Sequence, residues 1–87
     1  MILRSNKKFE KQFEKLPSNI QSKVERVIKI FSSNPFNKSL NNHSLKGYLQ
    51  NYRAISVTGN IRIIFEEFDN YTLVIFIDLG THEQVYK

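Results

Sequence analysis

The sequence has 87 residues, of which 40% are hydrophobic and 24% charged, and its formal net charge is +5. This length allows one domain with one modest core, and the composition excludes a disordered tail. Because the sequence has no cysteine, a disulfide framework and a thiolate metal site are excluded. The N-terminal stretch lacks the apolar segment of a secretory signal, and the longest apolar run, Leu73 to Ile77, is too short to cross a membrane. We therefore expect one domain over residues 1–87 that is soluble and cytoplasmic.

The charge is distributed unevenly along the chain. Residues 1–65 carry 12 Lys and Arg against three Glu, a net charge of +9, whereas residues 66–87 carry one Lys against five acidic residues, a net charge of −4. A basic body of this kind favours a polyanion or an acidic protein as partner. A solvated surface explains the charge equally well, so the charge alone leaves both interpretations open.

The N-terminal region predicts a strand and then a helix. Met1–Arg4 is typical of a short edge strand. After it, apolar side chains recur at helical spacing at Phe9, Phe13 and Leu16, which predicts one face of a helix. Pro17 ends this helix because proline disrupts a helix interior.

A second helix is predicted directly after Pro17. Ser18 and Gln21 match a capping box, S-x-x-Q, at its start. The helix should end near Asn34, because a residue that precedes a proline is disfavoured in the helical conformation. The joint between the two helices is short, so they should form an antiparallel hairpin. The apolar stripe of the second helix consists of Ile20, Val24, Val27, Ile28 and Phe31.

The rest of the chain predicts a small sheet. Residues 34–47, NPFNKSLNNHSLKG, lack periodicity and are typical of a loop. Three strand-like runs follow, joined by turns around TGN and DN: Tyr52–Val57, Ile61–Phe68 and Tyr71–Leu79. The third run is apolar on both faces, which predicts a central strand covered on both sides. The fold class expected is α+β, with an N-terminal antiparallel helical hairpin packed on a small, mainly antiparallel sheet of three to four strands.

Arg62 is unusual for its position in a middle strand. Alternation places it on the face opposite to the apolar residues that pack on the helices, beside Ala54 and Ser56 if TGN is a three-residue loop. A guanidinium there is costly unless it has a partner or borders a cleft. A salt bridge to an acidic residue such as Asp78 is the simpler explanation, and the pattern leaves both open.

The C-terminal stretch GTHEQVYK holds two further side chains capable of chemistry. Gly80 is expected to let the chain turn sharply out of the sheet. His82 then follows, and an imidazole can exchange protons near neutral pH. A histidine here is more commonly a surface residue, Tyr86 a core-capping aromatic and His43 a loop residue. The sequence shows no serine–histidine–carboxylate arrangement and no spacing typical of a metal site.

Taken together, these segments resemble a known family. The pieces HSLKG, NYRAISVTGNIRIIFE and VIFIDLGTHEQVY, in this order, are similar to the RelE/ParE superfamily of toxin–antitoxin toxins. The two amphipathic helices match the helical hairpin of that superfamily, so the resemblance covers nearly the whole chain. The most similar members are the YafQ-type and RelE-type endoribonucleases, which cut messenger RNA.

The resemblance implies roles for four catalytic residues. Arg62 matches the strand arginine that contacts the scissile phosphate in RelE-like enzymes. His82 matches the histidine of the YafQ-type GTH motif, which acts as a general acid. Tyr86 matches an aromatic position that stacks on or orients the substrate. His43 matches the loop histidine of YafQ-type enzymes and is the only evident candidate for the general base.

Two further residues are expected to bind RNA. Lys46 belongs to HSLKG, which resembles the loop motif of the family ahead of the sheet. Arg53 lies near a basic position of RelE-type enzymes, although alternation puts it on the opposite face from Arg62. The chain also departs from the family. YafQ-type enzymes carry a further histidine and an aspartate where Ser56 and Asn60 stand here, and neither residue can serve as a base.

The resemblance implies attack by an RNA 2′-hydroxyl on the adjacent phosphate, with no metal or other cofactor. It also implies that messenger RNA is cut in the A site of the 70S ribosome, which inhibits translation, and that a cognate antitoxin covers the toxin. A different function stays open, since ParE-type members share this scaffold but bind DNA gyrase without cutting RNA. They generally lack the catalytic histidine and tyrosine, so the sequence favours the nuclease.

Overall fold

The computed structural model describes residues 1–86 and is built around one sheet. Its strands are β1 (Ile2–Ser5), β2 (His43–Ser44), β3 (Arg53–Ser56), β4 (Ile61–Phe68) and β5 (Leu73–Thr81). They lie in the order β1-β5-β4-β3-β2. The strands from β2 to β5 pair antiparallel, whereas β1 pairs parallel with β5. The predicted meander and the predicted N-terminal edge strand are therefore confirmed.

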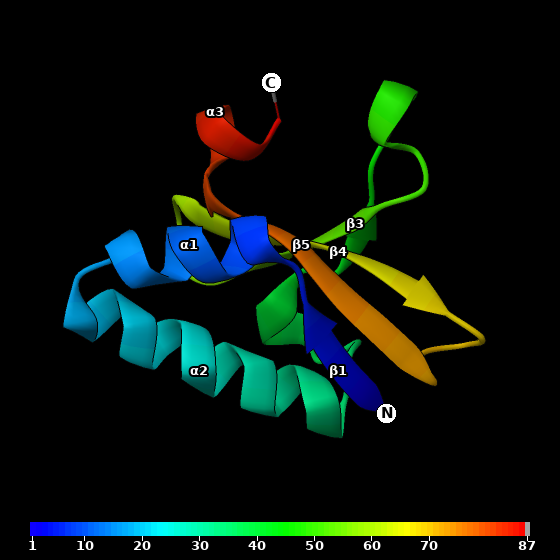
Figure 1. Cartoon of the computed structure of the whole chain (residues 1–87). Helices are drawn as coiled ribbons and strands as arrows, with labels where there is room; N and C mark the ends of the chain where they lie inside the picture. Colours follow the sequence, from blue (N-terminus) through cyan, green and yellow to red (C-terminus); the bar gives the residue numbers. More distant parts are fainter. Residues whose placement is uncertain (87) are drawn as a thin grey trace.

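Two helices, α1 (Lys7–Lys15) and α2 (Ser18–Ser33), cover one face of this sheet. Figure 1 shows them side by side and antiparallel, as predicted. Phe31 of α2 lies at the centre of the core, and its ring contacts the rings of Phe65 and Phe76. The buried residues of this core are Phe9, Val24, Phe31, Leu40, Ile55, Ile63, Phe65, Val74, Phe76 and Leu79.

The predicted α+β class is confirmed, but the sheet has five strands rather than three to four. The additional strand, β2, lies in the stretch predicted to be a loop, where His43 pairs with Ala54 and Ser44 with Arg53. Two 3₁₀ helices, η1 (Lys38–Leu40) and η2 (Gly47–Leu49), flank this strand. A strand of two residues is too short to show an alternating pattern in the sequence. It forms here because it pairs with the free edge of β3.

The capping box predicted at Ser18 and Gln21 is wrong. Pro17 is the N-cap of α2, and no side chain caps this helix. Gln21 Nε2 instead donates to the backbone oxygen of Phe13 at 2.9 Å. The last carbonyls of a helix lack partners within the helix, and the short joint brings Gln21 beside those of α1. The side chain therefore ties the two helices together.

The strand β5 is an interior strand, between β1 and β4, as its apolar sequence predicts. Val74 and Phe76 are buried under the helices, but Ile75 and Ile77 on the other side are only half-buried. The strand continues to Thr81, so the sharp turn predicted at Gly80 is wrong. The short helix α3 (His82–Val85) begins directly after the strand. Within residues 1–86, no helix is long and apolar enough to span a membrane.

Candidate functional site

A cavity of about 570 Å³ lies between α3 and the segment that carries β2 and η2. Figure 1 shows α3 and the green 3₁₀ helix η2 at the same end of the sheet, with a gap between them. The predicted catalytic residues His43, Arg62, His82 and Tyr86 all line this cavity, as does Lys46. The full lining is Asn41, His43, Ser44, Leu45, Lys46, Tyr48, Leu49, Arg62, His82 and Tyr86.

Arg62 enters the cavity from β4. Its register partners are Ser56 of β3, as predicted, and Gly80 of β5. Because both neighbours are small, they leave room around the guanidinium. Its Nη1 donates to the carbonyl oxygen of Thr58 at 2.8 Å and to that of Ile61 at 3.3 Å. These bonds orient the fork, whose other donors have no partner among residues 1–86.

The salt bridge between Arg62 and Asp78 that pattern alone left open is not formed. Asp78 Oδ2 instead lies 3.1 Å from Nζ of Lys8, which reaches it from α1. The bond to Thr58 turns the guanidinium toward the β3–β4 turn and away from Asp78. Within the described part of the chain, Arg62 has no carboxylate partner. Its charge is therefore available for an anion such as a phosphate.

His82 and Tyr86 are positioned together by α3. The Thr81 hydroxyl accepts from the backbone N–H of Gln84, and the Gln84 side chain accepts from the backbone N–H of Thr81, which makes a capping box. The backbone N–H of His82 also donates to the carbonyl of Asn60, which anchors α3 to the β3–β4 turn. The rings of His82 and Tyr86 meet edge to face, with centroids 4.2 Å apart.

The environment of Tyr86 keeps its phenol neutral. Burial raises the pKa of the Tyr86 hydroxyl above 10.0, and the positive charge of Arg62 acts in the opposite direction with a smaller effect. The hydroxyl therefore stays protonated near neutral pH, where it can donate a hydrogen bond. Arg62 and Tyr86 both line the cavity.

His43 is held by a hydrogen bond within its own loop. Asn41 adopts a left-handed conformation, with φ of 50°, which asparagine tolerates better than most residues. The carbonyl oxygen of Asn41 accepts from Nδ1 of His43 at 2.8 Å. Because a carbonyl oxygen only accepts, the neutral ring carries its proton on Nδ1 and leaves Nε2 free to accept a proton.

The two residues expected to bind RNA are placed differently. Lys46 lines the cavity, whereas Arg53 lies outside it. Arg53 Nε donates to Oδ1 of Asn42 at 2.8 Å, and its guanidinium lies over the ring of Phe36. The alternation of β3 explains this separation, and binding of RNA by Arg53 stays a prediction.

Sequence reasoning missed Tyr48. This residue of η2 lines the cavity although 73% of its surface is exposed, which is unusual for a large aromatic side chain. A tyrosine next to Gly47 in a stretch without periodicity was the only available signal. Among residues 1–86, no three His, Asp or Glu side chains are grouped as potential metal ligands.

The fold is similar to those of small bacterial and archaeal toxins of known structure. The YoeB/ParE toxin from Agrobacterium tumefaciens is 18% identical, with a TM-score of 0.79 over 94% of this chain and 99% of that one. YafQ from E. coli is 20% identical, with a TM-score of 0.76 over 98% and 97%. The RelB–RelE antitoxin–toxin complex from Methanococcus jannaschii contains a chain that is 28% identical, with a TM-score of 0.72 over 95% and 94%.

The family follows from the sequence itself. Residues 1–87 match the family described as the bacterial toxin of type II toxin–antitoxin system, YafQ, and the chain belongs to that family. Among curated proteins, none matched the sequence. The resemblance to RelE/ParE toxins of the YafQ type is therefore confirmed.

Proposed function

We propose that this toxin is an endoribonuclease that cuts messenger RNA in the ribosomal A site and thereby inhibits translation. The observation that carries the proposal is the cavity lined by His43, Arg62, His82 and Tyr86. Two imidazoles, a guanidinium without a carboxylate partner among residues 1–86 and a neutral phenol supply the functions that phosphodiester cleavage needs. Belonging to the YafQ family adds support.

The proposed reaction is a transesterification within the RNA. Nε2 of His43 takes the proton of the 2′-hydroxyl, and the 2′-oxygen attacks the adjacent phosphorus. Arg62 binds the phosphoryl oxygens as negative charge develops on them. The bond from phosphorus to the 5′-oxygen then breaks, and His82 donates a proton to that oxygen. The products are a 2′,3′-cyclic phosphate and a 5′-hydroxyl, and no step requires a metal ion.

Tyr86 positions the substrate in this scheme. Its ring already meets His82 edge to face, and its protonated hydroxyl can donate to a phosphate or sugar oxygen. Stacking of a base on an aromatic ring is worth about 1–3 kcal/mol. Lys46, at the rim of the same cavity, adds a positive charge for the RNA backbone.

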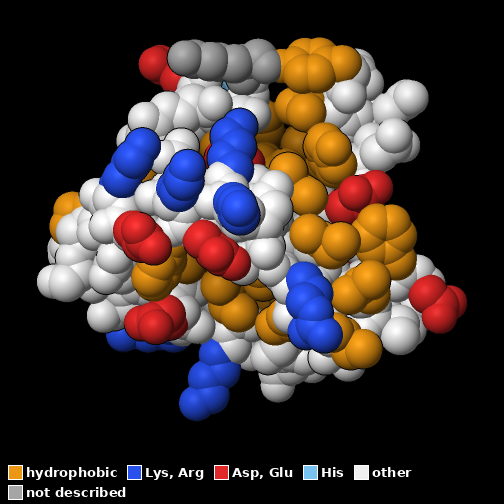
Figure 2. Space-filling view, in the orientation of Figure 1, with side chains coloured by type: hydrophobic (Ala, Val, Ile, Leu, Met, Phe, Trp, Pro, Cys, Tyr) orange, Lys and Arg blue, Asp and Glu red, His pale blue; other side chains and the backbone are white. Residues whose placement is uncertain are grey.

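The surface charge supports docking on ribosomal RNA. Lys7, Lys8, Lys11 and Lys15 project from α1 around one shallow hollow. Figure 2 shows blue side chains gathered over this helix. These lysines can neutralise phosphate groups of RNA, so the affinity for the ribosome should fall steeply as the salt concentration increases. We also propose a cognate antitoxin as partner, because RelE-type relatives form complexes with an antitoxin.

Expression with matched variants tests the function. Induction of the wild-type chain should arrest growth and produce cut messenger RNA, mapped by primer extension. Arg62→Ala and His82→Ala should abolish the arrest. Loss of a positioned acid such as His82 costs about 10²–10⁴ in rate, and loss of Arg62 removes the cation that binds the phosphoryl oxygens. Arg26→Ala is the matched control, since this exposed arginine lies on α2, which covers the other face of the sheet.

The outcomes separate the candidate functions. If Arg62→Ala and His82→Ala stay fully toxic at equal protein levels and messenger RNA is intact, the nuclease proposal is wrong. A toxin that binds a protein such as DNA gyrase is then preferred. Cleavage of naked RNA by the purified chain would contradict the need for the ribosome while preserving the proposed chemistry.

A further inference from the structure

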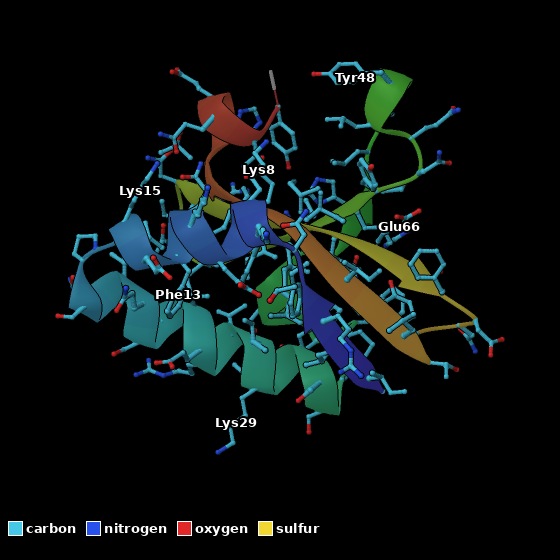
Figure 3. The ribbon with its side chains drawn as sticks, viewed as in Figure 1. Lys8, Phe13, Lys15, Lys29, Tyr48 and Glu66 are labelled. Carbon is cyan, nitrogen blue, oxygen red and sulfur yellow. The ribbon has the colours of Figure 1, made fainter. Side chains whose placement is uncertain are left out.

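A second cavity, of about 270 Å³, lies next to the candidate catalytic cavity. The two cavities share Tyr48 and Leu49 of η2, and α3 borders both of them. Figure 3 shows Tyr48 extending from η2 toward α3, and Lys8 on the side of α1 nearest α3. The lining of the second cavity is Lys8, Tyr48, Leu49, Tyr52, Ile64, Ile77, Asp78, Gln84 and Val85.

The walls of this cavity suit a flat aromatic ring. Ile64, Ile77 and Val85 belong to one apolar cluster on the face of the sheet away from α1 and α2. Tyr52 packs against the same cluster, and Tyr48 stands exposed at the rim that the two cavities share. Aromatic side chains and apolar floors of this kind stack the unpaired bases of single-stranded RNA.

The polar groups of the cavity are an acceptor and a donor. Asp78 is 6% exposed; its Oδ1 accepts from the backbone N–H of Leu79 at 2.8 Å, and its Oδ2 pairs with Lys8. A carboxylate has about four acceptor sites, so further acceptor capacity remains. Gln84 uses Oε1 to accept from Thr81, which leaves its Nε2 hydrogens to donate. A ligand that fits must therefore offer N–H donors to Asp78 and a carbonyl oxygen to Gln84.

We propose that this cavity binds the guanine base of a nucleotide next to the cleaved linkage, with Asp78 and Gln84 as the residues that determine specificity. This inference rests on the proposed ribonuclease function. The guanine edge presents two adjacent donors, N1–H and N2–H, for the carboxylate, and the O6 acceptor for the amide. Uracil offers one N–H between two carbonyl oxygens, which the carboxylate repels. Adenine and cytosine offer one amino group and no adjacent ring N–H.

A binding experiment tests the cavity without any cleavage. The full chain is titrated with 5′-GMP, 5′-AMP, 5′-CMP and 5′-UMP, and binding is followed by NMR shifts of Tyr52 and of the Gln84 side-chain amide. GMP should bind most tightly, and Asp78→Asn should reduce its advantage about five- to hundredfold, since the amide offers one acceptor in place of two. Equal binding of the four nucleotides, or no shifts in this cavity, would overturn the proposal.

A cleavage experiment tests the same residue in the reaction. Cut sites of the wild-type chain should be enriched in guanine next to the cleaved linkage, and Asp78→Asn should remove the enrichment. Asp69→Asn is the matched control, because this exposed aspartate lies in the distant β4–β5 turn.

The two experiments distinguish this proposal from the proposed function. Cleavage without guanine enrichment, or enrichment that survives Asp78→Asn, contradicts the base-binding cavity and leaves the ribonuclease intact. Selective binding of GMP by a chain that cuts no RNA contradicts the ribonuclease and supports the cavity. Melting curves of each variant confirm that the folded chain is being compared.

Discussion

At the residue scale, one backbone carbonyl determines what His43 can do. The left-handed conformation of Asn41 directs its carbonyl oxygen to Nδ1 of His43, so Nε2 is the basic nitrogen of the neutral ring. The ring of His82 instead meets that of Tyr86 edge to face. The two imidazoles thus have different neighbours.

The two imidazoles, as the proposed base and acid, predict a bell-shaped pH profile of kcat/KM around neutral pH. In the proposed reaction the base must be deprotonated and the acid protonated, so the rate is highest between the two limbs. His43→Ala should remove the acidic limb and His82→Ala the alkaline limb. Because burial raises the pKa of Tyr86 above 10.0, its phenol does not titrate in this window, and Tyr86→Phe should lower the rate without moving either limb. A flat wild-type profile would contradict the histidine pair.

At the element scale, α3 depends on close packing against the end of β5. A Cβ added at Gly80 would lie 2.6 Å from Oε1 of Gln84, the oxygen that accepts from Thr81 in the capping box. Glycine at this position therefore allows the close approach of Gln84 rather than a turn. It also leaves the space beside Arg62, its register partner in β4.

Gly80→Ala should displace the Gln84 side chain and break the capping box. The hydrogen bond from Thr81 N–H to Gln84 Oε1 is then lost, at a cost of about 1 kcal/mol, which urea unfolding can measure. Because α3 carries His82 and Tyr86, ribonuclease activity should fall by more than the loss of folded chain explains. Gly59→Ala is the matched control, since a Cβ there meets no atom within 4 Å. Equal effects of the two substitutions would refute this role of Gly80.

At the scale of the whole molecule, the sheet separates the main core from the candidate site. The face toward α1 and α2 holds the main core, in which Phe31 is fully buried and contacts the rings of Phe65, Tyr71 and Phe76. The opposite face and the sheet end beside α3 hold the two cavities. Substitutions in the helical layer should therefore change stability more than cleavage chemistry.

Phe31→Leu tests this separation. It removes ring contacts that the surrounding core cannot fully replace, and about 1–2 kcal/mol should be lost. For a domain of this size, the melting temperature should fall by roughly 4–16 °C. The folded variant should keep the cleavage pattern of the wild type. Phe36→Leu is the control, because Phe36 is 58% exposed and should cost less than about 0.5 kcal/mol. A similar shift for both variants would contradict the central role of Phe31.

Periodic and local features were predictable from the sequence, whereas contacts between distant segments were not. The alternation in β3 and β4 predicted the pairing of Ser56 with Arg62, because strand period and loop length determine the register. The ion pair of Asp78 with Lys8 could not be foreseen, since it depends on where α1 crosses the sheet. The local sequence around Gln21 matches a capping box. In the fold, however, its side chain donates to the backbone carbonyl of Phe13 in the preceding helix, a contact that the local pattern does not predict.

The residues of the candidate site also include some that the sequence predicted and some that it did not. His43, Arg62, His82 and Tyr86 were identified through the family resemblance, and the fold explains how residues so far apart in the sequence line one cavity. Tyr48 and Asn41 were missed, because loop residues that shape a cavity leave no periodic signal. The position of the His43 proton on Nδ1 could not be predicted either, because it depends on the backbone conformation of Asn41.

The two edges of the sheet have a consequence for self-association. The edge strands are short: β1 has four residues and β2 has two. Each therefore offers few backbone groups to the strands of another copy, and Arg4 places an exposed charge on one edge. Growth of fibrils by edge-to-edge pairing is thus disfavoured.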